Sequence, residues 1–430
     1  MTRDRSEERS RRPWSRLSRI AQGGALWLGC GLGAAFAGGS TPGAPVGPGA
    51  AVVPGAAAVP GPSAAPSAPA PRATPAQEAK PRDESLTVVT PEQAQAVERG
   101  LAWLRDRQND DGSWTAKIGY KLNTNYQYTE DKRGHVGVTA LAGMAFLAGG
   151  HVPGRGPYGA TVERALDFVL SAVQEDGYIT HAGSRMYSHA FATIFLAEIC
   201  GMTDRADVRT KLQLAVDFIV HSQNAEGGWR YEPYAVESDM SIVVCQVLAL
   251  RAARNIGIRV PKSVIDKAAR YVVDSAVTEE SISQSWGGRA YRSEIGSFHY
   301  QKEDASRSSF SLTAAGVTAL HGVGIYSAES IDAGIRYLMS SLDRFQRMYG
   351  RSAGYHYFFW YGHYYGVQAL YTAGGPAWDA YFDSVRSEIL SGQSPDGSWP
   401  NDTGPGPAFG TACAVLILEI PYRFLPIFQR

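Results

Sequence analysis

The chain has 430 residues, and its 41 Lys and Arg are balanced by 41 Asp and Glu, so the formal net charge at pH 7 is zero. This balance excludes the basic surplus that is typical of nucleic-acid-binding proteins. The four cysteines include no CxxC pair, and Cys200, Cys245 and Cys413 lie in apolar stretches, which predicts buried free thiols.

Residues 1–40 have the pattern of an export signal. An arginine-rich start precedes the apolar stretch AQGGALWLGCGLGAAFAGG, which contains the small-residue triplet AFA at 35–37. Three versions stay open: cleavage after Ala37, retention of residues 20–39 as a membrane anchor, and lipidation of Cys30. Each predicts export across the cytoplasmic membrane to the cell envelope or periplasm. The anchor and the lipid would also attach the chain to the membrane.

Residues 41–90 consist mainly of Ala, Pro, Gly and Ser. Such a segment cannot bury enough apolar surface to offset the entropy of ordering it, so we expect a disordered, extended linker. The folded domain is predicted to span residues 91–430. Its first helix begins at TPEQ, where Thr90 suits the N-cap and Pro91 the first helical position.

Two classes of helix alternate through this domain. The first class is amphipathic, with apolar residues at helical spacing on one face; it covers 95–108, 161–174, 212–223, 264–273, 331–342 and 382–393. The second class is apolar nearly all round and must be buried on both sides; it covers 136–149, 188–201, 239–253, 311–324, 361–375 and 408–420. Six partly exposed helices alternating with six buried ones predict an all-α fold, an (α/α)6 toroid with an inner and an outer ring.

A short turn recurs after three of the amphipathic helices, as QNDDGSW (108–114), QNAEGGW (223–229) and QSPDGSW (393–399). Its glycine suits a positive φ angle at a helix end, and its tryptophan is a large apolar anchor. Two weaker copies place Tyr178 at the tryptophan position and Trp286 in a shifted frame. We interpret the turn as architectural.

The spacing Gln-x-x-x-Gly-x-Trp resembles the QW repeat of the squalene-cyclase and protein-prenyltransferase superfamily, the terpenoid cyclase-like toroids. The segment MYSHAFATIFLAEICG and the tail LEIPYRFLPIFQR further resemble exported bacterial proteins with prenyltransferase/squalene-oxidase repeats. The resemblance covers about residues 91–430. It implies the toroid fold and an axial cavity for an isoprenoid-like amphiphile.

The resemblance also implies a catalytic centre. Class II cyclases protonate an alkene with an Asp in a D-x-D-D-T motif, and ESDMS (237–241) stands at the matching place. It puts Asp239 at the proton-donating position and Glu237 at the first acid, while Met240 replaces the last acid. If the chain is an enzyme, it would be an isomerase or lyase of this type. The alternative is that Asp239 caps a helix. His189 is a third catalytic candidate, or a hydrogen-bonded core residue.

A ligand site is predicted at one mouth of the toroid. All inner helices run parallel, so their N-termini and their partial positive charges meet there. Arginine and aromatic side chains on or before these helices are the candidate ligand-binding residues: Arg185, Tyr187, Phe191, Arg230, Tyr231, Trp286, Tyr355 and His363. The alternative is that the rings fill the core and the arginines are solvated. No spacing suits a metal, and no cofactor is expected.

Two functional hypotheses therefore stay open. One is an exported protein that binds or cyclises an isoprenoid-like amphiphile in its axial cavity. The other is a non-catalytic toroid, a scaffold that binds protein or cell-envelope partners. An apolar or amphiphilic small molecule is the partner in the first case, and nucleic acid is expected in neither.

Overall fold

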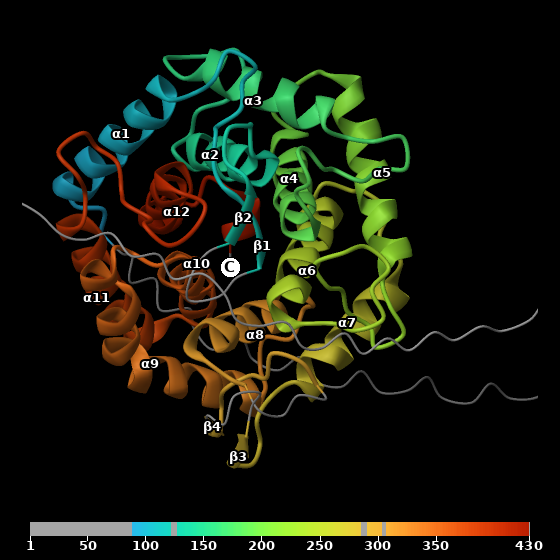
Figure 1. The fold of residues 1–430 in the computed structure, drawn as a ribbon, viewed down its shortest axis with the longest axis vertical. Helices are drawn as coiled ribbons and strands as arrows, with labels where there is room; N and C mark the ends of the chain where they lie inside the picture. Colours follow the sequence, from blue (N-terminus) through green and yellow to red (C-terminus); the bar gives the residue numbers. More distant parts are fainter. Residues whose placement is uncertain (1–87, 122–126, 285–289, 303–306, 430) are drawn as a thin grey trace, which may run out of the picture. The chain divides into compact units, whose positions relative to one another are not determined.

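A computed structural model describes residues 88–121, 127–284, 290–302 and 307–429. Within these residues, twelve α-helices alternate between an outer and an inner ring (Figure 1). The outer helices are α1 (Pro91–Asp106), α3 (Gly159–Ser171), α5 (Ala206–Ser222), α7 (Lys262–Asp274), α9 (Glu329–Tyr349) and α11 (Gly375–Ser391). The inner helices are α2 (Val136–Ala148), α4 (Met186–Ile199), α6 (Met240–Asn255), α8 (Phe310–Gly322), α10 (Tyr357–Ala373) and α12 (Pro407–Glu419).

The helices close into two rings. Each inner helix packs against the next, and α12 returns to α2; in the outer ring α1 contacts α11 and also packs on α12. Burial follows the two sequence classes, because every residue of α2 is buried whereas α7 buries only one stripe. The predicted (α/α)6 toroid is confirmed. The predicted leader lies outside the described residues, as does the linker before residue 88.

The recurrent turns tie neighbouring outer helices together. In the second copy, the indole N–H of Trp229 donates to the carbonyl of Ile219 in α5 at 2.8 Å. The amide of Gln223 donates to the turn itself and, at 2.9 Å, to the carbonyl of Val264 in α7. The copies at Gln108 and Gln393 make the same bonds, and all three tryptophans are buried. The predicted burial of these tryptophans at outer-helix ends is confirmed.

A glycine at positive φ lies at the centre of each turn. At Gly227 φ is +91°, and a Cβ atom there would lie 2.5 Å from the carbonyl oxygen of Lys267 in the next outer helix. The same conformation and the same close approach to a backbone carbonyl occur at Gly112, Gly177, Gly296 and Gly397. Only glycine permits such contact without strain. The turn is therefore built five times in the described residues, twice with a changed sequence.

The two changed copies differ from the sequence prediction. The tryptophan position is two residues after the glycine, so Ile179 occupies it after Gly177, and Phe298 occupies it after Gly296. Both side chains are fully buried. Tyr178 is therefore not the counterpart of tryptophan. Trp286 lies outside the described residues, and the turn it was assigned to is formed by Gly296 instead.

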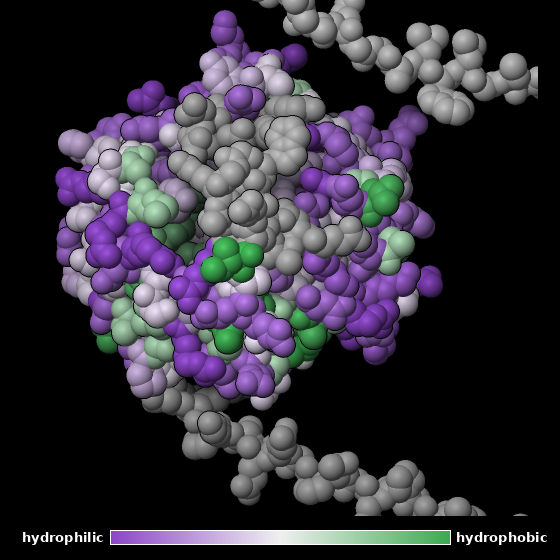
Figure 2. Space-filling view, turned by 60° about the horizontal axis from the view of Figure 1, so that its bottom comes forward, coloured by the Kyte–Doolittle hydropathy of each residue, from purple (hydrophilic) through white to green (hydrophobic). Residues whose placement is uncertain are grey.

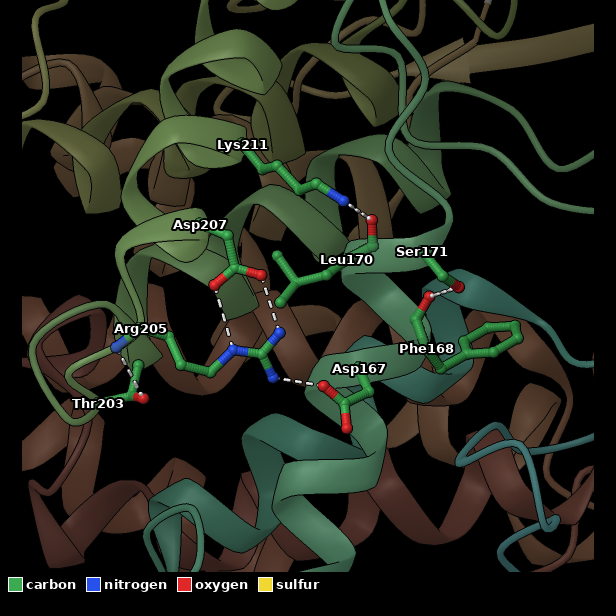
Figure 3. Close-up of polar contacts among 8 residues, drawn as sticks. All are labelled: Asp167, Phe168, Leu170, Ser171, Thr203, Arg205, Asp207 and Lys211. Carbon is green, nitrogen blue, oxygen red and sulfur yellow. Dashed lines mark hydrogen bonds and ion pairs between the residues drawn. The ribbon is translucent and has the colours of Figure 1, made fainter.

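The contact between α3 and α5 uses different chemistry, because the Gln174 amide donates to the carbonyl of Ala172 and, within the described residues, to no carbonyl of α5. Arg205, just before α5, pairs with Asp167 of α3 and with Asp207 of α5 (Figure 3). Lys211 Nζ also donates to the carbonyl of Leu170 at 2.7 Å. Charged side chains thus join the outer helices where the bridging glutamine is absent.

Two small antiparallel hairpins, not predicted from the sequence, interrupt the connectors. Strands β1 (Ile118–Lys121) and β2 (Gln127–Glu130) pair between α1 and α2. Strands β3 (Ser281–Gln284) and β4 (Ala290–Ser293) pair between α7 and α8. Both hairpins lie in connectors that run from the outer to the inner ring. They therefore belong to the mouth where the inner helices begin.

The opposite mouth is closed by the last described residues. The short 3-10 helices η2 (Ile420–Tyr422) and η3 (Pro426–Phe428) follow α12, and η3 contacts α6. Ile427 and Phe428 are buried, and the Phe428 ring meets Tyr364 with centroids 6.4 Å apart. No helix within the described residues has the length and apolarity needed to cross a membrane, and the candidate anchor at 20–39 is not among those residues.

Candidate functional site

Two adjoining cavities open at the mouth where the inner helices begin. The first, here called the aromatic pocket, has a volume of about 130 Å³. It is walled by rings from α4, the α5–α6 connector, α10 and α12: Tyr187, Phe191, Tyr231, Tyr357, Tyr361, Tyr364 and Phe409. Arg185 and His135 add polar groups to its wall. This end of the barrel is the one predicted from the helix directions.

The second cavity, here called the polar cavity, has a volume of about 730 Å³ and extends from the axis over the N-terminus of α8 to the outer helix α9. It shares four wall residues with the aromatic pocket: Tyr187, Tyr231, Tyr357 and Tyr361. Its further wall carries charged groups and hydroxyls, including Arg292, Glu294, Arg307, Ser309, Ser341 and Arg344. The two cavities thus adjoin at these four tyrosines, and one is mainly apolar whereas the other carries charged and hydroxyl groups.

Arginines outnumber carboxylates on the described walls of the two cavities. Arg307 places its guanidinium 3.8 Å from the ring centroid of Tyr300, and it forms no ion pair within the described residues. Arg185 pairs with Glu232 at 2.9 Å and lies 5.7 Å from the Tyr231 ring. Glu294 is the only carboxylate on the polar cavity's described wall, against three arginines. Two of these arginines are ion-paired, because Arg344 lies 3.8 Å from Glu294 and Arg292 pairs with Glu280 at 2.8 Å. The N-termini of the inner helices add partial positive charges at this mouth.

Asp239 lies one layer behind the wall. Its Oδ1 atom accepts from the backbone N–H of Ile242 at 3.1 Å, which makes it the N-cap of α6, and it also accepts from the Ser241 hydroxyl. Its Oδ2 atom faces Tyr300, whose hydroxyl donates to it at 3.4 Å. Tyr300 lines the polar cavity, so Asp239 reaches the site through this hydroxyl. The capping role predicted as the alternative is confirmed.

The pKa of Asp239 is raised to about 6. Complete burial disfavours its charged form and is the largest cause. The hydrogen bonds from Ser241 and Ile242, together with Arg230 and Arg307, act in the opposite direction. Asp239 is therefore a weaker acid than an ordinary aspartic acid, and near neutral pH a fraction of it carries a proton.

The other two catalytic candidates do not meet Asp239. Glu237 pairs with Arg230, and 65% of its side chain is exposed, so Glu237 lies at the surface and lines neither cavity. His189 is buried, with Nδ1 accepting from Ile179 N at 3.0 Å and Nε2 lying 3.2 Å from the carbonyl of Ala215. Burial lowers its pKa to about 3. It takes the place that Thr139 has beside Trp114, and its role is structural.

The predicted ligand-binding residues divide into two groups. Arg185, Tyr187, Phe191 and Tyr231 line the aromatic pocket, and their role in ligand binding stays a prediction. Arg230, Tyr355 and His363 line neither cavity, and Trp286 lies outside the described residues.

Tyr355 and His363, before and within α10, are packed among other rings. Tyr355 is buried against Trp360, and its hydroxyl donates to the carbonyl of Glu388. His363 is enclosed by Phe310, Phe345 and Phe359. Neither side chain can therefore reach a ligand in the cavities.

Sequence reasoning missed several wall residues on α10. Tyr357, Tyr361 and Tyr364 stand at i, i+4 and i+7 and so share one face of the helix, which is the face toward the aromatic pocket. The same spacing had correctly paired Tyr187 with Phe191 on α4. Tyr300 was missed because it lies in a connector, where helical spacing gives no signal.

His135 both caps α2 and lines the aromatic pocket. Its Nδ1 atom accepts from the backbone N–H of Val138 and caps α2, and its ring lines the aromatic pocket. Burial lowers its pKa to about 4, so the ring is neutral near pH 7. Because Nδ1 accepts, Nε2 carries the proton. His135 is thus a hydrogen-bond donor at the pocket wall.

Within the part of the chain that the structure describes, no side-chain cluster is suited to holding a metal ion. No three His, Cys, Asp or Glu side chains gather there to hold an ion. Cys200, Cys245 and Cys413 are free thiols, and burial raises the pKa of Cys245 and Cys413.

Figure 2 shows one face on which hydrophilic residues prevail and hydrophobic ones form separate small patches. Among the described residues, the exposed large apolar side chains include Val236, Ile282 and Ile295.

Comparison with known proteins places the chain by fold. No protein-family model matches it, and no curated protein matches its sequence. The GH76A α-1,6-mannanase from Salegentibacter sp. HEL1_6 is 9% identical, with a TM-score of 0.53 over 77% of this chain and 99% of that one. An α-amylase from Clostridium perfringens is 8% identical, with a TM-score of 0.50 over 76% and 97%.

The type II terpene cyclase MstE from Scytonema is 14% identical, with a TM-score of 0.49 over 78% of this chain and 99% of that one. The mannanase and the amylase, with TM-scores of 0.53 and 0.50, resemble this chain in its α/α-toroid fold. At such low identities the likeness extends to the fold and indicates no activity.

Proposed function

We propose that this protein binds an amphiphile with an apolar, isoprenoid-like tail and an anionic head. The observation that carries the proposal is that the two cavities adjoin and share four wall tyrosines. One part is apolar and aromatic, and the other carries arginines. A single molecule that spans both must be apolar at one end and anionic at the other.

The dimensions of the aromatic pocket suit a short tail. A cavity needs on the order of 10–15 Å³ of such volume to hold one water molecule, so the pocket has room for roughly ten groups of that size. Its aromatic faces favour unsaturated or branched hydrocarbon. The head would then lie near Tyr231, between Arg185 and Arg307, both of which reach the site from connectors.

Calorimetric titration with three probes tests the proposal: farnesyl phosphate, farnesol and inorganic phosphate. Farnesyl phosphate is expected to bind at least about tenfold more tightly than either part alone, because a charged hydrogen bond adds about 1.5–3 kcal/mol. Arg307→Gln should remove the advantage of the phosphate over the alcohol. Arg155→Gln, on the connector at the opposite mouth, should leave it unchanged.

Two results would count against binding of an amphiphile. Equal affinity for farnesol and farnesyl phosphate would remove the anionic head from the proposal. Absence of binding by every probe would favour the scaffold hypothesis, in which the toroid presents its surface to protein or cell-envelope partners.

Cyclisation is a second candidate, favoured by the position of Asp239 behind Tyr300. Two features weigh against it. A raised pKa makes Asp239 a weak proton donor, whereas protonation of an alkene requires a strong one. Glu237 is also turned to solvent. Incubation with geranylgeraniol, followed by gas chromatography with mass spectrometry, tests for cyclisation. A cyclic product that the wild type forms and Asp239→Asn does not would establish cyclisation by Asp239. The absence of any product would refute it.

The cellular location belongs to the same proposal. Export would place the site in the cell envelope, where amphiphiles are drawn from membranes. Its support is the apolar leader of residues 1–40 with the uncharged run from Ala21 to Pro71. Fractionation of cells, with mass spectrometry of the mature N-terminus, distinguishes cleavage, anchoring and lipidation.

A further inference from the structure

We infer that Asp239 is a positioning residue that couples the binding of an anionic head in the polar cavity to its own protonation. The inference rests on the proposed function and deepens it, because it says what controls the affinity of that site. It requires that Asp239 be linked to the cavity wall, that its charge face the bound head, and that its neighbours stay uncharged while it titrates.

The link is a chain of hydroxyl groups. The Tyr231 hydroxyl lies 3.0 Å from the Tyr300 hydroxyl, which donates to Asp239 Oδ2 at 3.4 Å. Since the Tyr300 proton points to Asp239, the proton between the two tyrosines belongs to Tyr231. Both hydroxyl protons therefore point away from the cavity while Asp239 is ionised. An anion in the cavity then meets oxygen lone pairs rather than donors.

Protonation reverses this arrangement. Oδ1 already accepts from Ile242 N–H and from the Ser241 hydroxyl, so an added proton resides on Oδ2, facing Tyr300. The protonated carboxyl then donates to the Tyr300 oxygen, and the Tyr300 hydroxyl is free to turn its proton toward the cavity. At the same step the negative charge behind the wall disappears. Both changes favour an anionic head.

The groups around Asp239 keep their charge states while it titrates. Arg230 and Arg307 face it from the two connectors and act on it as positive charges. Five tyrosines and a thiol also face it from α4, α6, α7, α10 and the connectors, and burial raises the pKa of each, so all stay neutral: Tyr187, Tyr231, Cys245, Tyr271, Tyr300 and Tyr361. Among this group of neighbouring side chains, the charge change below pH 7 is thus that of Asp239.

The coupling between anion binding and the protonation of Asp239 fixes the direction in which the affinity changes with pH. Affinity for an anion should be highest when Asp239 is protonated and should fall as the pH rises through about 6, then level off once the carboxylate is fully ionised. A unit charge several ångströms from the head, in surroundings of intermediate dielectric, changes affinity by roughly tenfold or more.

The experiment uses decane-1-sulfonate, whose charge is constant between pH 4.5 and 8.5. Wild-type protein should bind it roughly tenfold more tightly at pH 5 than at pH 7.5. Asp239→Asn keeps a good helix cap and removes the charge, so its affinity should be the same at both values. Glu237→Gln is the matched control: this neighbouring acid is exposed and lies off the chain of hydroxyls, so the variant should retain the pH dependence.

Equal wild-type affinities at the two pH values, or a pH dependence that persists in Asp239→Asn, would overturn the coupling while leaving the proposed function standing. Failure of decane-1-sulfonate to bind the wild type at either pH would overturn both. If Asp239→Asn does not fold, as judged by its melting curve, Tyr300→Phe takes its place. That variant breaks the chain of hydroxyls and should reduce the ratio of affinities, and an unchanged ratio would refute the relay.

Discussion

Polar residues at the starts of four inner helices cap those helices. Asp239, Ser309, His135 and His356 each accept a hydrogen bond from a backbone N–H of the helix that follows. The sequence sufficed to predict a cap at Asp239, because capping depends on local chain geometry. It could not reveal the partner of the second oxygen, since Tyr300 is 61 residues away in the chain.

Glu198 carries the clearest prediction at a single residue. It is buried in the last turn of α4, accepts a hydrogen bond from the backbone N–H of Ile427, and leaves Oε2 without a partner in the described residues. Burial raises its pKa to about 8 from an ordinary value of 4.5. The unfolded chain therefore releases this proton at lower pH than the folded one, and the stability of the native state falls as the pH rises from about 4.5 to about 8.

Glu198→Gln removes this titration. Relative to the wild type, the variant should gain stability progressively between pH 4.5 and 8, reaching a few kcal/mol, and no further gain is expected above pH 8. Urea denaturation at a series of pH values measures it. The slope with pH is the readout, because a buried amide N–H without a partner shifts stability equally at every pH. A parallel pair of curves would contradict the buried-acid assignment.

At the scale of elements, the turns show where sequence patterns succeed and fail. The glycines of the three clear copies were predicted to take positive φ, and Gly112, Gly227 and Gly397 do so. The fourth turn was misplaced because the hairpin β3–β4 is inserted inside it: Val277 N donates to Ser297 O across the insertion. A pattern with fixed spacing cannot detect such an insertion.

Gly227→Ala tests the close approach of outer helices at these turns. Positive φ alone costs a residue with a side chain about 1–2 kcal/mol, and the clash with the Lys267 carbonyl should add about 1–3 kcal/mol of overpacking. Gly183→Ala is the matched control, since Gly183 also has positive φ, at +80°, but a Cβ there meets no atom within 4 Å. Thermal unfolding of both should separate the two costs. Equal losses would mean that the helices move apart freely.

At the scale of the whole molecule, the alternation of two helix classes predicted the two rings. An inner helix is buried on both sides and is therefore apolar nearly all round, whereas an outer helix keeps one polar face.

The extent of the folded domain stays a prediction. Limited proteolysis should cut within residues 40–90 and leave a stable core that begins near Thr90, because an Ala- and Pro-rich segment offers accessible backbone. Mass spectrometry of the fragments measures it, and protection of that segment would show that it packs on the toroid.

In the outer ring, the contact between α11 and α1 joins the two ends of the domain, and no segment of the chain connects these helices directly. There Gln393 donates to the carbonyl of Ala96 at 2.8 Å and accepts from Arg99. Gln108 makes the matching bonds to Thr161 and Arg164 between α1 and α3, which the chain joins through α2. Each glutamine replaced by alanine should cost a similar 1–2 kcal/mol in global unfolding.

Local opening should nevertheless differ between these two variants. Gln393→Ala lets α1 separate from α11 without unfolding the rest, so amide hydrogens of α1 should exchange faster than in the wild type. In Gln108→Ala the same helix stays held at the closure, and its exchange should change little. Equal exchange in the two variants would mean that the ring opens at every joint alike. A difference confined to α1 would locate the first opening of the toroid at the place where its two ends meet.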